Sequence, residues 1–181
     1  MADLELLVEH RHRMWSDIGR WGEAEIVAHD PRYRAWVAER LPAGAFEGFI
    51  AERGGRVLGS GGLWWMPEQP RPGYPTGPVP YILSMYTAPE HRGRGVASAI
   101  VRAMLRRARV AGAPRVTLHA SDQGRPVYAR LGFERSWEMR RFVDPRMRAR
   151  YAARRRGRVG PRSTARAGPG RGRRPPRSRR P

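Results

Sequence analysis

A glycine-bearing segment, residues 89–97, constrains the fold of this chain more than any other stretch. An apolar run, 81–88, precedes it and predicts a buried strand, and an amphipathic run, 98–112, follows it and predicts a helix. Gly93 and Gly95 permit positive φ angles and a close approach of the backbone to a ligand. Several N–H groups can then point at one anion beside the positive end of the helix dipole. We therefore expect a phosphate or pyrophosphate to bind at this turn.

Two common phosphate motifs do not fit the segment. A P-loop needs a lysine after its second glycine, and the chain contains no lysine. A dinucleotide-binding fingerprint needs a third glycine and an acidic residue about twenty positions later. Ser98 stands in place of that glycine, and Arg115 stands near the place of the acid.

The segment instead resembles the pyrophosphate loop of the Gcn5-related N-acetyltransferase (GNAT) family. That loop has Arg or Gln, two residues of any type, Gly, one residue of any type, and then Gly or Ala. The matching residues are Arg92, Gly93, Arg94, Gly95, Val96 and Ala97. In the family this loop holds the pyrophosphate of acetyl-CoA, although six residues taken alone would also fit an ordinary helix start.

A second motif of the same family follows about thirty residues later. After a predicted strand over 115–120, segment 121–133 resembles the family's short helix, which ends in a tyrosine followed by three residues and Gly-Phe. Tyr128, Gly132 and Phe133 occupy these positions. Two motifs in the right order around one β-α-β unit are far more specific than either alone. The chain is therefore identified as a member of the GNAT family over about residues 4–143.

Hydrophobic periodicity and turn residues predict the elements around this unit. Asp3 is expected to cap the first helix, and Asp30 with Pro31 to begin the second. The predicted elements are helices over 3–18 and 30–41, hairpin strands over 46–52 and 57–65, a proline-rich loop over 66–80, and a last strand over 133–142. The loop is either a lid of the acceptor site or an excursion packed against the sheet.

The resemblance implies an α/β (α+β) GNAT fold. Its central sheet is mixed and mostly antiparallel, with one parallel β-α-β unit and flanking helices. The family's first edge strand has no room before a helix that begins at residue 3. Either that strand is missing or the true start of the chain lies upstream of Met1. The second closing strand is also reduced or absent.

Charge is divided unevenly along the chain. All 16 acidic residues lie at or before Asp144, whereas residues 146–181 contain 15 of the 36 basic residues. We therefore predict a GNAT acetyltransferase domain over 1–144 and a disordered Arg/Pro/Gly-rich tail over 145–181. Such a tail can contact nucleic acid or another polyanion without sequence preference. A solvated tail without a partner, with its arginines reflecting codon composition, explains the same pattern.

Several classes of protein are excluded by residues that the chain lacks. It contains no cysteine, which excludes disulfides, thiolate metal sites and a cysteine nucleophile. No apolar run approaches the ~20 residues of a membrane span. We expect a cytoplasmic protein without a metal ion or membrane contact, and a homodimer stays open.

The resemblance also implies a mechanism, the direct transfer of acetyl from acetyl-CoA to an amine of a small molecule or a protein. In the family a β-bulge in the strand before the loop exposes N–H groups to the cofactor, and by position these come from Met85, Tyr86 and Thr87. Tyr128 matches the general acid that protonates the departing thiolate. Ser121 stands where the family has an asparagine near the cofactor.

The general base is not identified by the sequence. Glu25, His29 and His119 are candidates, and Glu90 is a poorer one because it follows the strand on the phosphate side. Two other functions stay open. One is a non-catalytic acyl-CoA-binding module in which Tyr128 only packs, and the other is a nucleic-acid or ribosome-associated protein whose tail dominates.

Overall fold

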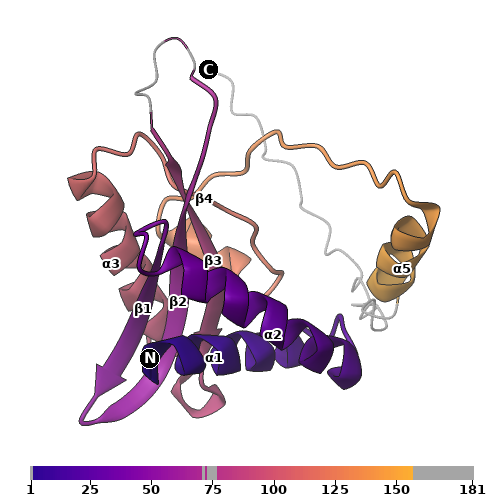
Figure 1. The fold of residues 1–181 in the computed structure, drawn as a ribbon, viewed down its shortest axis with the longest axis horizontal. Helices are drawn as coiled ribbons and strands as arrows, with labels where there is room; N and C mark the ends of the chain where they lie inside the picture. The colour runs from indigo at the N-terminus through magenta and orange to yellow at the C-terminus, as the bar shows by residue number, and fades with distance from the viewer. Residues whose placement is uncertain (1, 71, 73–76, 157–181) are drawn as a thin grey trace, which may run out of the picture. The chain divides into compact units, whose positions relative to one another are not determined.

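The structure is a computed structural model that describes residues 2–70, 72 and 77–156, in two units, Met1–Trp137 and Glu138–Pro181. Figure 1 labels the helices and strands. In the first unit these are α1 (Ala2–Ile18), α2 (Glu23–Arg40), β1 (Phe46–Arg53), β2 (Arg56–Met66), β3 (Val79–Thr87), the 3-10 turn η1 (Pro89–His91), α3 (Val96–Val110), β4 (Thr117–Leu118) and α4 (Arg125–Arg130). The second unit contains α5 (Pro145–Arg156).

The four strands form one sheet in the order β1-β2-β3-β4. β1 and β3 both pair antiparallel with β2, whereas β3 and β4 are parallel and are connected through α3. Gly54 and Gly55 turn the β1–β2 hairpin with φ angles of 58° and 71°, as a two-glycine turn predicts. The predicted fold class, a mixed sheet with one parallel β-α-β unit, is confirmed. Within the described residues no strand precedes α1.

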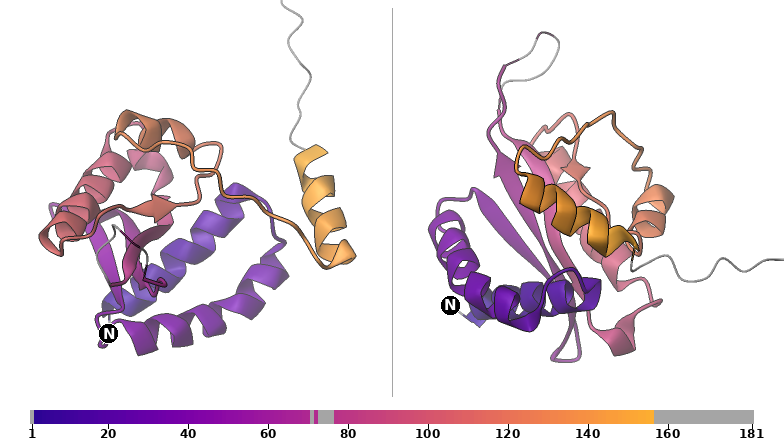
Figure 2. Two further views of the ribbon diagram at one scale, coloured as in Figure 1. Left: turned by 90° about the horizontal axis from the view of Figure 1, so that it is seen from above. Right: turned by 90° about the vertical axis from the view of Figure 1, so that its right-hand side faces the viewer.

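Helices cover both faces of this sheet. Figures 1 and 2 show α1 and α2 on one face and α3 on the other. The sheet and α3 share a core of Leu63, Ile82, Val96, Ile100, Val101 and Met104. The core on the other face consists of Leu7, Val8, Tyr33, Val37 and Phe46. The apolar stripe of α3 is therefore a core surface, and its first turn is left at the end of the sheet where β3 ends.

The predicted start of the second helix at Asp30 was wrong. α2 begins at Glu23, and the N–H of Gly22 donates a hydrogen bond to Glu25 Oε2 (3.1 Å), which stabilises the helix end. Asp30 is not a cap, because its Oδ2 lies 2.6 Å from Nδ1 of His12 in α1. Most of the segment 20–29, which lies between the two predicted helices, is thus helical.

Pro31 lies inside α2, where a proline ordinarily costs about 3 kcal/mol. Burial along one face explains why the helix continues. Ile26 before the proline is 4 % exposed, and Tyr33 and Val37 after it are 7 % and 0 % exposed. Burying three such side chains contributes roughly 1.5–3 kcal/mol each, which outweighs the cost.

The prediction of a last strand over 133–142 was also wrong, because these residues form no strand. The strand before it is shorter than predicted, since β4 comprises only Thr117–Leu118 instead of 115–120. A two-residue strand presents few backbone groups to a further neighbour. The sheet therefore ends at β4 in the described part of the chain.

The first residues of the predicted tail, which lie in the second unit, form a helix. The sequence led us to expect no regular structure from residue 145, whereas α5 covers Pro145–Arg156. Asp144 explains its start, because Oδ1 accepts a hydrogen bond from the N–H of Arg146 (2.8 Å) and Pro145 occupies the first helical position. Residues 157–181 lie outside the described residues, so the disorder predicted there, like the boundary at 144, stays a prediction.

Gly59 of β2 is the basis of a stability prediction. A methyl group at this position would lie 2.5 Å from the carbonyl oxygen of Tyr86 and 3.1 Å from Cα of Thr87, both in the backbone of β3. Backbone atoms cannot rotate aside, so we expect Gly59→Ala to lower the free energy of unfolding by about 1–3 kcal/mol in denaturant titrations. Gly22→Ala is the control, since its methyl group would meet Glu25 at an ordinary 3.8 Å. Equal stability of the two variants would contradict the prediction.

Candidate active site

β3 is interrupted by a β-bulge shortly before it ends. Between successive pairs of the β2–β3 ladder, β2 has one residue and β3 has two, Ser84 and Met85. Ser84 has a φ of 52°, the only positive φ of a non-glycine residue in the described part of the chain. Residues held in this region store strain and cluster at functional sites. The bulge that the family resemblance implied is therefore present, just ahead of Tyr86 and Thr87.

The strands β3 and β4 separate beyond a short pairing. Tyr81 pairs with Thr117 and Ile82 pairs with Leu118, and no further pair joins these strands, although β3 continues to Thr87. A groove of about 420 Å³ lies in this opening, lined by β3, the start of α3, the segment before α4, α4 itself and α1. Of the predicted site residues, the lining includes Met85, Tyr86, Thr87, Arg92, Ala97, Ser121 and Tyr128.

The other predicted site residues lie in the loop beside the groove. Gly93 and Gly95 have φ angles of 74° and 83°, and Gly95 is the N-cap of α3. The glycine positions therefore have the left-handed backbone that their residue type suggested. The first N–H groups of α3 have no partner within the helix and can bind an anion. Val96 can contribute to such a site only through its backbone, because its side chain is buried in the core.

The two arginines of the loop differ in what they contact. Arg92 donates from Nε to the carbonyl oxygen of Thr87 (3.0 Å) and forms an ion pair with Asp17 of α1. Arg94 is exposed and forms no ion pair with any described residue. Arg92 therefore ties the loop to β3 and α1, and Arg94 is the arginine whose charge is available to a phosphate.

Tyr128 reaches the groove from α4. Its ring packs edge-on against Phe133, with centroids 5.7 Å apart, and its hydroxyl group makes no hydrogen bond to a described residue. Burial raises the pKa of Tyr128 to about 12, with a smaller contribution from Tyr81. The phenol is thus protonated at neutral pH and can donate into the groove.

The segment between β4 and α4 places Ser121 and His119 on the same wall. Ser121 Oγ accepts a hydrogen bond from the N–H of Gly124 (3.0 Å), which stabilises the turn before α4. His119 hydrogen-bonds through Nδ1 to the hydroxyl group of Tyr81. Both side chains line the groove.

The candidate bases are not all in one place. His119 shares the groove with Tyr128, whereas Glu25 and His29 line a separate cavity of about 160 Å³ at α1 and α2. Nδ1 of His29 donates to the carbonyl oxygen of Glu25 (2.9 Å), which leaves Nε2 as the basic nitrogen. Glu90 in η1 does not line the groove.

The sequence analysis missed the wall that α1 contributes. Its residues in the groove are Arg11, Met14, Trp15, Asp17 and Ile18. The apolar members recur at helical spacing, a pattern that by itself indicates a stripe facing the core. That spacing also places Arg11 on the same face, four residues before Trp15 and seven before Ile18. This charge within an apolar stripe was the available signal.

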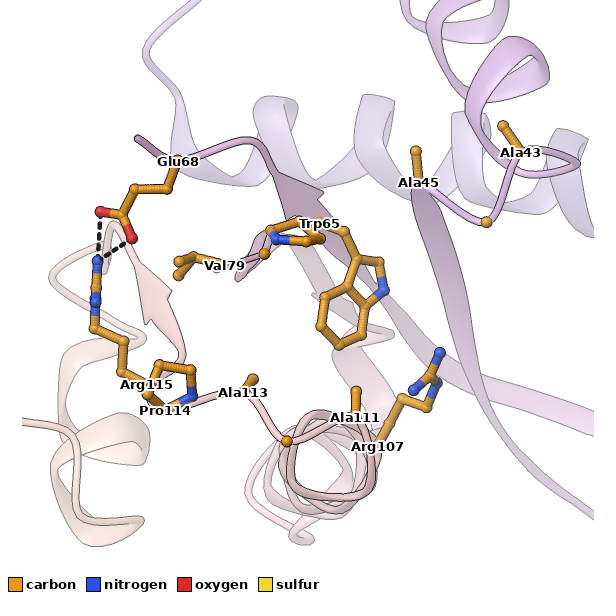
Figure 3. A pocket seen from close by; sticks show the side chains of 14 residues that line it. Ala43, Ala45, Trp65, Glu68, Val79, Arg107, Ala111, Ala113, Pro114 and Arg115 are labelled. Carbon is orange, nitrogen blue, oxygen red and sulfur yellow. Dashed lines mark hydrogen bonds and ion pairs between the residues drawn. The ribbon is translucent and has the colours of Figure 1, made fainter. Parts of the chain in front are cut away.

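A second large cavity, of about 490 Å³, lies at the other end of β3 and α3 (Figure 3). Its arginines are paired, Arg115 with Glu68 (2.5 Å) and Arg107 with Glu47 (2.8 Å). Arg107 also lies over the ring of Trp65, with Cζ 5.1 Å from the centroid. The cavity has no lining residue in common with the groove, so it is not a candidate for the same chemistry.

No group of three or more His, Asp or Glu side chains in the described part of the chain is placed to hold a metal ion. No helix among the described residues is long and apolar enough to cross a membrane.

Comparison with known proteins gives a family and several similar structures. Residues 7–133 match the model of the acetyltransferase (GNAT) family. A GCN5-related N-acetyltransferase from Ralstonia eutropha JMP134 is 32 % identical, with a TM-score of 0.72, over 78 % of this chain and 93 % of that chain. A predicted acetyltransferase from Clostridium acetobutylicum, solved with acetyl-CoA, is 27 % identical, with a TM-score of 0.72, over 78 % and 90 %. No curated protein matches the chain.

A more distant structure shares the fold alone. The aminoglycoside 6'-N-acetyltransferase AAC(6')-IG from Acinetobacter haemolyticus is 18 % identical, with a TM-score of 0.53, over 64 % of this chain and 81 % of that chain.

Proposed function

Because this chain belongs to the GNAT family of N-acetyltransferases, which use acetyl-CoA, we propose that it transfers acetyl directly to a primary amine within the groove between β3 and β4. The observation that carries the proposal is the separation of these strands beside the bulge at Ser84 and Met85. It leaves one edge of β3 without a strand partner at the point where the pyrophosphate loop begins.

The groove offers each part of acetyl-CoA a complementary surface. The N–H groups of residues 93–97, with Arg94, bind the pyrophosphate at the start of α3. The pantetheine arm lies along the open edge of β3 and hydrogen-bonds to the backbone of Met85, Tyr86 and Thr87, as a bound peptide extends a sheet. The same N–H groups stabilise the oxyanion that forms on the thioester carbonyl. Ser121 borders the cofactor on the opposite wall.

The reaction needs little from the protein besides position and proton transfer. The neutral amine attacks the carbonyl carbon of the thioester, an N–C bond forms, and the C–S bond breaks. Tyr128 gives its proton to the departing thiolate, and His119 or an ordered water takes the proton of the attacking nitrogen. Holding the two reactants together contributes an effective concentration on the order of 10⁵ M or more.

The proposal is tested by the release of free CoA from acetyl-CoA in the presence of pooled amines, with products identified by mass spectrometry. We expect acetylation of at least one small-molecule or protein amine. If acetyl-CoA binds by calorimetry but no amine is acetylated, the protein is a non-catalytic acyl-CoA-binding module.

The arginine-rich tail is predicted to bind polyanions independently of this chemistry. Residues 146–181 contain 15 arginines and no acid. A chain truncated after Asp144 should keep its acetyltransferase activity but elute from heparin at a much lower salt concentration. Each phosphate neutralised should contribute ~0.9 to the salt slope of DNA binding by the full chain. Equal heparin retention of both forms would indicate a solvated tail without a polyanionic partner. A cytoplasmic location and a homodimer stay predictions.

A further inference from the structure

Arg11 is the one arginine of the groove that forms no ion pair within the described part of the chain. It forms no ion pair and no hydrogen bond with a described residue. Its Cζ lies 4.1 Å from the ring centroid of Tyr33 and 5.7 Å from that of Trp15. Burial also lowers the pKa of Arg11, although nearby Tyr33 and Asp30 partly oppose the shift. The guanidinium is thus held on aromatic surfaces and partly removed from water.

Other cavity arginines show how unusual this is. Arg92 in the same groove is paired with Asp17, and Arg107 and Arg115 in the cavity of Figure 3 are paired with Glu47 and Glu68. A partly buried charge is costly unless it is paired. An aromatic face compensates only in part. The missing partner of Arg11 is therefore expected to come from a ligand.

The position of Arg11 relates this charge to the reacting atoms. Tyr33, whose ring lies under the guanidinium, is also directed by its hydroxyl group toward Ser84 Oγ at the bulge (3.3 Å). One tyrosine ring therefore spans the distance between the charge and the strand that holds the thioester. The guanidinium and the bulge thus contact opposite ends of one tyrosine side chain.

Arg11 and Trp15 also line the 160 Å³ cavity at α1 and α2, together with Trp21, Glu25, Ile26 and His29. Trp15, Trp21 and Ile26 form the apolar part of its wall, and the cavity adjoins the groove through Arg11 and Trp15. We propose that the acceptor is an amine that carries a carboxylate bound by Arg11 and an apolar side chain that enters this cavity. The smallest molecule with these three groups is an α-amino acid with an apolar side chain.

The inference rests on the proposed transfer reaction and names its class of acceptor. A guanidinium binds a carboxylate through two parallel N–H···O bonds, which fix its orientation as well as its position. The same charge disfavours polycationic amines at this wall.

The test uses matched amines that differ in the carboxylate alone, phenylalanine with phenethylamine and leucine with 3-methylbutylamine. Their nitrogens differ in intrinsic reactivity, so the measure is how Arg11→Met changes kcat/KM for each member of a pair. We expect kcat/KM for the acid to fall about 10- to 100-fold and kcat/KM for the plain amine to change less than about threefold. Met keeps much of the apolar stem of Arg11 but not the guanidinium that lies over Tyr33, and Arg11→Lys, with charge but no planar fork, should fall between.

Arg107→Met is the matched control. Arg107 also lies over a tryptophan in a cavity wall, but it is already paired with Glu47. The Arg107→Met variant should leave the ratio of kcat/KM for the acid to kcat/KM for the plain amine unchanged. Melting temperatures exclude unfolding as a cause in either variant.

Equal losses for both members of a pair in Arg11→Met, or no loss, would overturn the inference while leaving the transfer reaction intact. If no amine is acetylated, the inference is tested by calorimetric titration of the same pairs into the CoA-bound protein. Binding of the acids that depends on Arg11 would support the inference and refute the transferase, and binding without such dependence, or no binding, would overturn it.

Discussion

Gly95→Asp is expected to abolish measurable binding of acetyl-CoA. Gly95 is the N-cap of α3 and has a φ of 83°, and a Cβ added there meets no atom within 4 Å. A side chain therefore has room here, although its backbone is strained at this φ, and what distinguishes aspartate from asparagine is its charge. Its carboxylate would occupy the positive end of the helix, where the pyrophosphate is proposed to bind, and two anions would compete for the same N–H groups.

Gly95→Asn is the matched control for this substitution. Asparagine and aspartate have almost the same shape and both tolerate the left-handed backbone conformation. We expect the Asn variant to bind acetyl-CoA within about tenfold of the parent, and the Asp variant to bind at least about 100-fold more weakly, since charge-assisted contacts contribute about 1.5–3 kcal/mol each. Both variants carry the same strain of a side chain at a φ of 83°, so the melting temperature of the Asp variant should match that of the Asn variant. Equal affinities of the two variants would place the pyrophosphate elsewhere.

Tyr128→Phe is expected to lower turnover by about 10² to 10⁴, the usual contribution of a general acid. The phenol is protonated at neutral pH, because burial raises the pKa of Tyr128 to about 12. A thiol in water has a pKa of about 8.5, so its thiolate would be a weak base toward this phenol. A thiol buried beside Tyr128 would have its pKa raised by the same effect, which would bring the two groups closer to a matched transfer.

The phenylalanine variant separates chemistry from packing. The ring contact with Phe133 does not involve the hydroxyl group, and that group makes no hydrogen bond to a described residue. Acetyl-CoA affinity should therefore stay within a few-fold of the parent, and the melting temperature should hardly change. Single-turnover measurements at saturating acetyl-CoA distinguish the alternatives. A turnover within about threefold of the parent would make Tyr128 a packing residue and assign the proton to water.

Features that depend on contiguous residues were predicted well from the sequence. The turn before α3 requires glycines at positive φ, and Gly93 and Gly95 supply them within three residues. The motif of Tyr128, Gly132 and Phe133 likewise forms within one short helix and its stop. The two-glycine hairpin is local in the same sense. In each case the physical requirement is carried by neighbours along the chain.

Features that depend on distant partners were mispredicted or missed. Pro31 indicates a helix start by local rules, but burial of Ile26, Tyr33 and Val37 against other elements extends α2 through it. The prediction of a last strand was wrong because a strand needs a neighbour to pair with, and β4 has only two residues available for pairing.

The sequence by itself determined the family, the parallel β-α-β unit and the loop at Gly95, because local backbone geometry and two spaced motifs specify them. Only the tertiary structure decided that Arg92 is paired with Asp17, 75 residues away, while Arg11 has no such partner. Both are arginines near apolar residues in the sequence. Which of them is available to a ligand depends on the packing of α1 against β3, because a charge is neutralised by what lies within a few ångströms in space.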